Sequence, residues 1–157
     1  MQKITPFLWF DSQAEEAMNF YVSIFKNSRA GKVTRYGENG LRPKGMVMTA
    51  SFQLEGQEFV SLNGGPKYQF TPAISFAVNC ETQQEVDELW DKLSVGSQYQ
   101  QCGWLTDKFG VCWQIVPTAL PNYLTDPDPA KVNRVMNAMM QMKKIEIDKL
   151  KQAYENR

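Results

Sequence analysis

The chain of 157 residues contains no histidine. Histidine is the commonest general base and a common metal ligand, so its absence excludes Ser-His and Cys-His catalytic pairs. An enzyme built on this chain would have to use carboxylates, lysine, tyrosine, cysteine or a bound cofactor. Only three cysteines occur, and Cys80, Cys102 and Cys112 form neither a disulfide framework nor a Cys-x-x-Cys metal pair. We therefore expect a reduced, cytoplasmic protein.

An excess of one charge and a long apolar run are also lacking. Lysine and arginine together number 17, as do aspartate and glutamate, so no overall field attracts nucleic acid. No apolar run approaches the roughly 20 residues of a membrane span. The first residues also lack the basic, apolar and small segments of a signal peptide. We therefore expect neither a nucleic-acid partner nor a membrane partner.

Two halves of the chain follow one plan, offset by about 69 residues. In each half an apolar strand precedes a helix with one apolar stripe, and only strands follow that helix. Ser12 with Glu15, and Thr82 with Glu85, have the spacing of capping boxes at the two helix starts. The predicted later strands are 31–37, 46–54 and 58–63 in the first half, and 97–105 and 111–117 in the second. The stretch 97–105 has room for two short strands.

This repeat predicts an α+β fold in which two β-α-β-β-β modules pair their curved sheets into a cup. The predicted segments are 1–66, 67–117 and a C-terminal helical extension over 118–157, all within one structural domain. Four of the eight prolines fall between Pro117 and Pro129, which predicts a connector without regular structure. Asp128-Pro129 then has the form of a helix start. The methionine-rich face of that helix would pack on its own domain or on a twin subunit, or would bind another partner.

The segment 103–117 predicts two strands joined by a turn at 107–110, and the second strand is apolar except for Gln114. A buried amide is costly unless it is hydrogen-bonded. Gln114 therefore either has a structural partner or replaces a residue that performed chemistry.

Several stretches resemble the vicinal oxygen chelate superfamily, which includes glyoxalase I, bleomycin-resistance proteins, fosfomycin-resistance enzymes and extradiol dioxygenases. They are "FLWFDSQAEEAMNFYVSIF", "SLNGGP", the pattern Trp-x-x-Asp-x-Phe-Gly-x-x-Trp-Gln-Ile from Trp104, and the tail "DPDPAKVNRVMNAMMQMKKIEIDKLKQAY". Within that superfamily the chain is most similar to the PhnB-like group, often labelled demethylubiquinone methyltransferase. The resemblance implies the cupped fold and a homodimer.

Metal-dependent members of the superfamily hold their ion with histidine on the first strand of each half and glutamate on the last. Carried over to this chain, those positions fall at about Thr5, Ser61, Ala73 and Gln114. Alanine has no donor atom, and hydroxyl and amide groups are weak ligands for divalent ions. We therefore expect no metal and no cofactor.

Alternation along the strands, combined with this resemblance, predicts the residues that face the cup. The residues expected to point outward instead, toward the helix on the outer face of each sheet, include Leu8, Phe10, Val60, Leu62 and Ile74. The predicted cup-facing residues are Thr5, Phe7, Trp9, Phe59, Ser61, Asn63, Ala73, Ser75, Cys112 and Gln114. Aromatic walls with a few neutral polar groups suit a small, largely apolar or aromatic organic molecule, which we expect as the partner. The alternative is that these side chains are core residues whose polar groups are satisfied internally.

S-adenosylmethionine binding usually relies on a glycine-rich turn that opens a helix. The sequence has no such turn, so it does not support the methyltransferase label. "YGENG" and "NGGP" lie between predicted strands and are typical of turns. The function predicted from the sequence is small-molecule binding, with no catalytic residue identified. Two alternatives stay open: a metal-independent enzyme of lyase, isomerase or transferase type, and a non-catalytic structural dimer.

Overall fold

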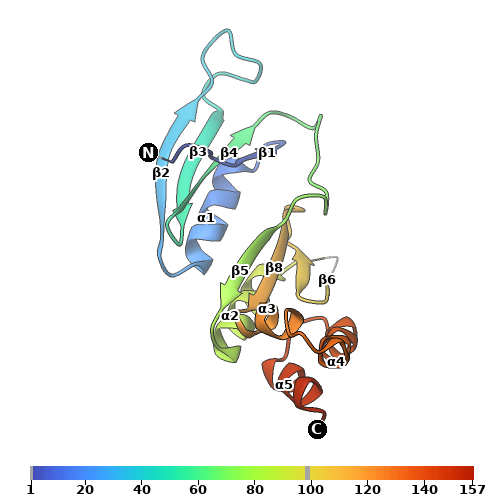
Figure 1. Cartoon of the computed structure of the whole chain (residues 1–157). Coiled ribbons are helices and arrows are strands. Elements are labelled where there is room, and N and C mark those ends of the chain that lie inside the picture. Colours follow the sequence, from blue (N-terminus) through green and yellow to red (C-terminus); the bar gives the residue numbers. More distant parts are fainter. Residues whose placement is uncertain (1, 98–99) are drawn as a thin grey trace. The chain divides into compact units, whose positions relative to one another are not determined.

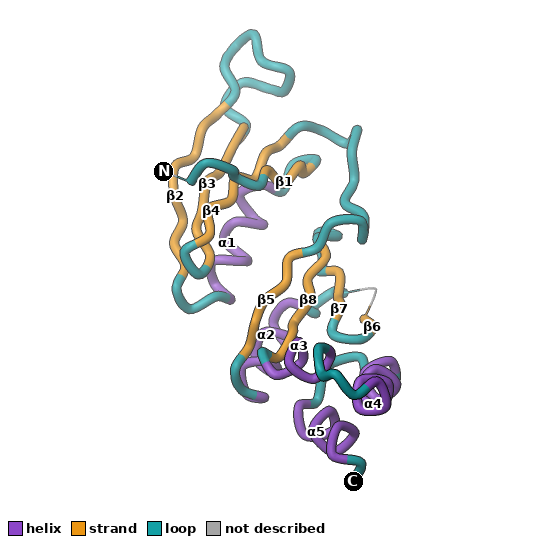
Figure 2. The backbone as a smooth tube through the Cα atoms, viewed as in Figure 1, coloured by secondary structure: helices purple, strands orange, loops and turns teal. Residues whose placement is uncertain are grey.

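The computed structural model describes residues 2–97 and 100–157. The chain divides into two compact units, and the boundary along the sequence falls between Phe70 and Thr71. The first unit holds β1 (Phe7–Phe10), α1 (Ala14–Ile24), β2 (Ser28–Arg35), β3 (Val47–Leu54) and β4 (Gln57–Asn63). The second holds β5 (Phe76–Cys80), α2 (Gln83–Leu93), β6 (Gln100–Gln101), β7 (Trp104–Thr106), β8 (Cys112–Pro117), α3 (Ala119–Leu124), α4 (Pro129–Met140) and α5 (Ile147–Glu155). Figure 1 labels most of these elements, and Figure 2 colours them by type.

The first sheet has the strand order β1-β4-β3-β2, with β1 parallel to β4 and the other pairs antiparallel. Helix α1 lies along one face of this sheet (Figure 1). The sequence alternates along each strand, so one set of side chains is buried beneath α1 and the other set faces away from it. The buried set includes Leu8, Phe10, Ala50 and Phe52, and Tyr21 of α1 stacks on Phe52.

The start of α1 differs from the prediction. The helix begins at Ala14 with Gln13 as its N-cap, and the Ala14 N–H donates to Asn63 Oδ1 of β4 over 2.8 Å. The capping box predicted at Ser12 and Glu15 is therefore wrong, because the N-cap is Gln13, which makes no side-chain cap hydrogen bond, and the first helical N–H is bound by a side chain from the sheet.

The second sheet has the order β5-β8-β7-β6, again with one parallel pair, β5 and β8. Helix α2 starts as predicted, since Thr82 Oγ1 accepts the Glu85 N–H over 3.2 Å. The stretch 97–105 is split into β6 and β7, and Cys102 and Gly103 between them have φ values of 53° and 83°. Residues 98 and 99 of that predicted strand lie outside the described residues.

The C-terminal extension is part of the second unit. Its helices share a small core of Leu120, Val135, Met142, Ile145 and Leu150. The predicted start of α4 is confirmed, because Asp128 Oδ1 accepts the Ala130 N–H over 2.9 Å. The connector predicted to lack regular structure instead contains α3, where Pro121 lies in the first turn and costs no intrahelical hydrogen bond.

These elements confirm an α+β fold of two four-stranded sheets with a C-terminal helical extension. None of the helices within residues 2–97 and 100–157 has the length and hydropathy that crossing a bilayer requires.

Candidate functional site

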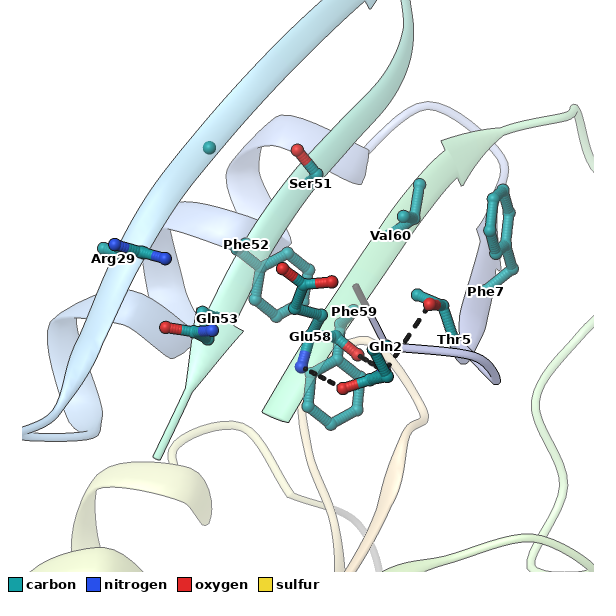
Figure 3. A pocket seen from close by; sticks show the side chains of 11 residues that line it. Gln2, Thr5, Phe7, Arg29, Ser51, Phe52, Gln53, Glu58, Phe59 and Val60 are labelled. Carbon is teal, nitrogen blue, oxygen red and sulfur yellow. Dashed lines mark hydrogen bonds between the residues drawn. The ribbon is translucent and has the colours of Figure 1, made fainter. Parts of the chain in front are cut away.

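The face of the first sheet that points away from α1 carries a hollow of about 490 Å³. Its apolar lining comes from Phe7, Phe52, Phe59 and Val60. Its polar lining comes from Gln2, Thr5, Arg29, Ser51, Gln53 and Glu58 (Figure 3). All of these residues belong to the first unit, so this hollow is complete within it.

Strand register arranges the side chains of this hollow in rows across the sheet. Arg29 on β2 is opposite Gln53 on β3, and Gln53 is opposite Glu58 on β4. One step along, Ser51 is opposite Val60, and Val60 is opposite Phe7 of β1. Residues paired across neighbouring strands share a face, so a charged row lies beside a largely apolar one (Figure 3).

The hollow is bounded at one edge by the chain before β1. The Gln2 side chain pairs with the backbone of Glu58, donating to its carbonyl over 3.1 Å and accepting its N–H over 3.1 Å. The same amide nitrogen lies 3.5 Å from Thr5 Oγ1 (Figure 3). The Gln2 side chain therefore binds the exposed edge of β4 as the backbone of a neighbouring strand would, and it holds Thr5 at the edge of the hollow.

Three predicted site residues of β4, namely Phe59, Ser61 and Asn63, point toward α1, so their predicted orientation is wrong. The Ser61 hydroxyl lies 2.9 Å from Ala14 O and 3.2 Å from Ala50 O, and Asn63 Nδ2 donates to Val47 O over 3.0 Å. Phe59 stacks on Phe52, so its ring belongs to the core although it also borders the hollow. The polar residues were assigned to the open face because alternation alone cannot distinguish a satisfied buried polar group from an exposed one.

The correct residues on the open face of β4 are Val60 and Leu62, which the sequence assigned to the helix side. On β1 the prediction is confirmed, because Leu8 and Phe10 are buried while Phe7 is 61% exposed. Trp9 shares the open face with Phe7, but its indole N–H donates to Gly65 O over 2.9 Å. A Cβ at Gly64 would collide with the Trp9 ring, so the Gly64-Gly65 turn can pack against this tryptophan only because residue 64 is glycine.

In the second unit the partner of Gln114 is Ser75. Gln114 Nε2 donates to Ser75 Oγ over 2.8 Å, which brings two predicted site residues together and gives the amide a structural partner. Ala73 is exposed, and its N–H donates to Thr71 Oγ1. Ile74, predicted to pack outward, is 72% exposed, because the chain enters β5 only at Phe76.

Cys112 lies on the Gln114 side of β8 but is 3% exposed. Burial, reinforced by the nearby Asp107 carboxylate, raises the pKa of its thiol. A raised pKa leaves little nucleophilic thiolate at neutral pH.

The Trp-x-x-Asp-x-Phe-Gly pattern has a structural explanation in Asp107, which is 3% exposed. Its Oδ1 accepts the N–H groups of Phe109 and Val111 over 2.9 and 3.0 Å, and its Oδ2 accepts the Trp113 indole N–H over 3.0 Å. The sequence predicted only that Asp107 lies in the turn at 107–110, and the hydrogen bond from Trp113 was not predicted.

The positions that the resemblance assigns to metal ligands do not fit a divalent ion. Ser61 is buried under α1, Gln114 is bound to Ser75, and Ala73 has no donor atom. Within residues 2–97 and 100–157, no group of three or more histidine, cysteine, aspartate or glutamate side chains could hold a metal.

Comparison with known proteins identifies the family. A sequence profile described as 3-demethylubiquinone-9 3-methyltransferase matches residues 2–116. The chain belongs to this family. The match confirms the PhnB-like group of the vicinal oxygen chelate superfamily that the sequence resembles. Searched against curated proteins, the chain has no significant match.

Several solved structures are similar to this PhnB-like chain. A PhnB protein from Bacillus cereus, described as a 3-demethylubiquinone-9 3-methyltransferase, is 42% identical over 74% of this chain and 100% of its own, with a TM-score of 0.67. Protein PA1353 from Pseudomonas aeruginosa is 20% identical over 74% of this chain and 98% of its own, with a TM-score of 0.62, and shows the fold. A glyoxalase/bleomycin resistance protein/dioxygenase domain from Frankia is also similar, at 13% identity over 74% and 92% of the two chains and a TM-score of 0.49.

Proposed function

We propose that this PhnB-like protein binds a small organic molecule on the open face of its first sheet. The observation that carries the proposal is the hollow of about 490 Å³, which falls in the range of small-molecule sites. Apolar side chains and a few polar groups at its rim are the usual composition of such sites. The predicted site residues Thr5, Phe7 and Phe59 border this hollow.

Exposure of Phe7 supports the proposal further. Large aromatic side chains are usually buried, yet the Phe7 ring is 61% exposed beside Val60 on the sheet. A ligand with a planar or apolar body would cover this surface and gain about 25 cal/mol for each Å² of apolar area removed from water.

The test is a screen of small aromatic compounds by ¹H–¹⁵N correlation spectra of the full chain. We expect compounds that bind to shift the amide signals of Ser51, Gln53 and Val60, and Phe7→Ala to weaken their binding about tenfold. Leu41→Ala is the matched control, because Leu41 is 97% exposed and lies outside the hollow. A screen in which no compound shifts the hollow's amides, or in which both variants behave alike, would overturn the proposal.

We also propose that the family's methyltransferase description does not extend to binding of S-adenosylmethionine by this chain. The connection between β1 and α1 is Asp11-Ser12-Gln13, without the glycines that let a cofactor approach the backbone at such a turn. Calorimetry with S-adenosylmethionine should give no heat of binding, and a micromolar dissociation constant would contradict this expectation.

We propose, finally, that the protein is a cytoplasmic homodimer, as the resemblance and composition imply. Met136 and Met140 on α4 are 37% and 52% exposed, and they offer an adaptable apolar surface for a second copy. Light scattering should report twice the monomer mass of 18.0 kDa. A monomer at micromolar concentration would contradict the dimer.

A further inference from the structure

Building on the proposed function, we propose that the hollow selects a zwitterionic ligand, one with a cationic group, an anionic group and an apolar or aromatic body. Arg29 would take the anionic group, Glu58 the cationic group, and Phe7 with Val60 the apolar body. The three contacts come from β2, β4 and β1 of the first unit. The proposal names a chemical class of ligand, which the general binding proposal leaves open.

The charges of the hollow lie on opposite sides of one strand. Arg29 and Glu58 both pair with Gln53, one from each side, so their backbones are about 10 Å apart at the usual spacing of neighbouring strands. Both side chains are long, so their charged ends can reach ligand groups that are a few ångströms apart. Gln53 lies between them and can donate to an anion or accept from a cation.

The charged groups of Arg29 and Glu58 are not engaged by other side chains that the structure describes. Among the described residues, neither Arg29 nor Glu58 has an ion-pair partner or a side-chain hydrogen bond, whereas Arg42, Lys44 and Lys149 are each paired with a carboxylate. Glu58 interacts through its backbone alone, with Gln2 and Gln57. Both charged groups are therefore free to bind a ligand.

Two opposite charges at one hollow discriminate between ligands by their charge pattern. A ligand that is only anionic would be attracted by Arg29 and repelled by Glu58, and a cationic ligand would meet the reverse. A neutral ligand would gain from neither group. Only a zwitterion engages both, because each of its charges can approach the opposite charge of the hollow.

The backbone beside Arg29 keeps this end of the hollow open. Gly31 lies at an irregularity in the pairing of β2 with β3, and a Cβ there would come within 2.8 Å of Ser51 O and Ser51 Oγ. The Ser51 hydroxyl donates to Lys32 O over 3.1 Å, which fixes the irregular stretch to β3. The lining beside Arg29 therefore consists of the Gly31 backbone and the small hydroxyl of Ser51.

The experiment uses four probes that share one benzyl group: L-phenylalanine as zwitterion, N-acetyl-L-phenylalanine as anion, L-phenylalaninamide as cation and N-acetyl-L-phenylalaninamide as neutral compound. Each is titrated into the ¹⁵N-labelled full chain at about pH 6 and low salt, and the amides of Ser51, Gln53 and Val60 are followed. At this pH the amine of L-phenylalaninamide is protonated and the carboxylates of the probes are ionised. We expect L-phenylalanine to bind at least fivefold more tightly than the other three. This preference should shrink as salt is added, because surface charges are screened.

Charge-reversal variants give the proposal a directional test. Arg29→Glu should shift the preference toward the cationic amide, and Glu58→Arg should shift it toward the anionic N-acetyl compound. Arg35→Gln, on the same strand but outside the hollow, and Glu15→Gln, on α1, are the matched controls and should leave the preference unchanged. The spectra themselves report whether each variant is folded.

The failures of the two proposals are distinguishable. If the neutral probe binds at the hollow as tightly as L-phenylalanine, selection of zwitterions is wrong and binding of small aromatic molecules stands. If none of the four shifts the hollow's amides, the zwitterion proposal is wrong, and the aromatic screen alone decides the proposed function. Charge reversals that leave the order of the probes unchanged would also overturn the roles of Arg29 and Glu58.

Discussion

Both units order their strands alike, β1-β4-β3-β2 and β5-β8-β7-β6, yet they fix their helices and turns by different means. In the first unit, Asn63 and Ser61 of the sheet bind the first residue of α1. In the second, Thr82 caps α2 from the adjacent sequence, and Asp107 binds groups two to six residues away. The start of α1 therefore depends on long-range polar contacts, whereas the start of α2 and the turn at Asp107 depend on local ones.

The two units also differ in what covers their surfaces. The first unit keeps a hollow with unpaired charges on its open sheet face. In the second, the C-terminal segment is tied to the scaffold, since Gln83 of α2 donates to Ile145 O over 3.0 Å and accepts the Ile147 N–H over 2.7 Å. Two units of one topology thus differ in use: the first has a hollow on its open sheet face, and the second holds the C-terminal helices.

The largest expected effect is on the local network of the second unit. Asp107→Ala removes three hydrogen bonds from a buried carboxylate and leaves the Trp113 indole N–H without its partner. We expect the free energy of unfolding to fall by about 3 kcal/mol. Urea denaturation followed by tryptophan fluorescence measures it, with Asp91→Ala, at an exposed position of α2, as the control. Equal effects of the two variants would show that the network contributes little.

The corresponding test in the first unit is Asn63→Ala. The change leaves the Ala14 N–H and Val47 O without the amide that bridges them beneath α1, and we expect a loss of about 2 kcal/mol in the free energy of unfolding. Hydrogen exchange of the first turn of α1 should accelerate in parallel. If exchange there is unchanged, the start of α1 does not depend on β4, and the contrast between the units is wrong.

The local cap of the second unit should matter less. Thr82→Ala removes one side-chain acceptor at the start of α2, and such caps contribute about 1 kcal/mol. Thr82→Ser retains the hydroxyl and serves as the control in the same urea experiment. A loss for Thr82→Ala greater than that for Asn63→Ala would reverse the order that we infer for local and long-range contacts.

The last expected effect is negligible at neutral pH and appears only in alkali; it also concerns the second unit, which holds all three cysteines. Burial, with a smaller contribution from the charge of Glu85, raises the pKa of Cys80 from 9.0 to about 12. The folded state therefore keeps a proton that the unfolded state loses, so this contribution to stability is complete below pH 9 and is lost between pH 9 and pH 12.

Cys80→Ala should accordingly reduce the fall in the free energy of unfolding between pH 8.5 and pH 10.5, with reductant present throughout. Cys102→Ala is the control, because Cys102 is only partly buried. An unchanged pH dependence in Cys80→Ala would contradict the raised pKa.

The strands and most helix bounds were predictable because alternation and the apolar stripes are local signals. Three features were not. The cap of α1 comes from Asn63, so inspection of residues 12–15 could not find it. Ser61 and Asn63 break the polar-outward rule because α1 and β3 supply hydrogen-bonding partners that exist only in the folded chain. Helix α3 tolerates Pro121 because of its place in the first turn.

The site was predictable only in part. The positions of Phe7 and Thr5 follow from alternation along the first strand. Arg29 and Glu58 can be placed in the same hollow only when the strand register that aligns both with Gln53 is known. The register depends on the lengths of the turns and on irregularities that insert residues into a strand. The irregularity at Gly31 is not marked by any distinctive sequence pattern. Lining residues contributed by three strands therefore could not be predicted from each strand taken alone.

The bond between Ala14 and Asn63 spans 49 positions of the chain, and this has a consequence for folding kinetics. Long-range contacts form only after the entropy of closing the intervening loop has been lost, which slows folding. Helix α1 gains this bond only once β4 has docked, so the first unit should fold in one late cooperative step. Helix α2 carries its own cap and can begin to form while its strands are still unpaired.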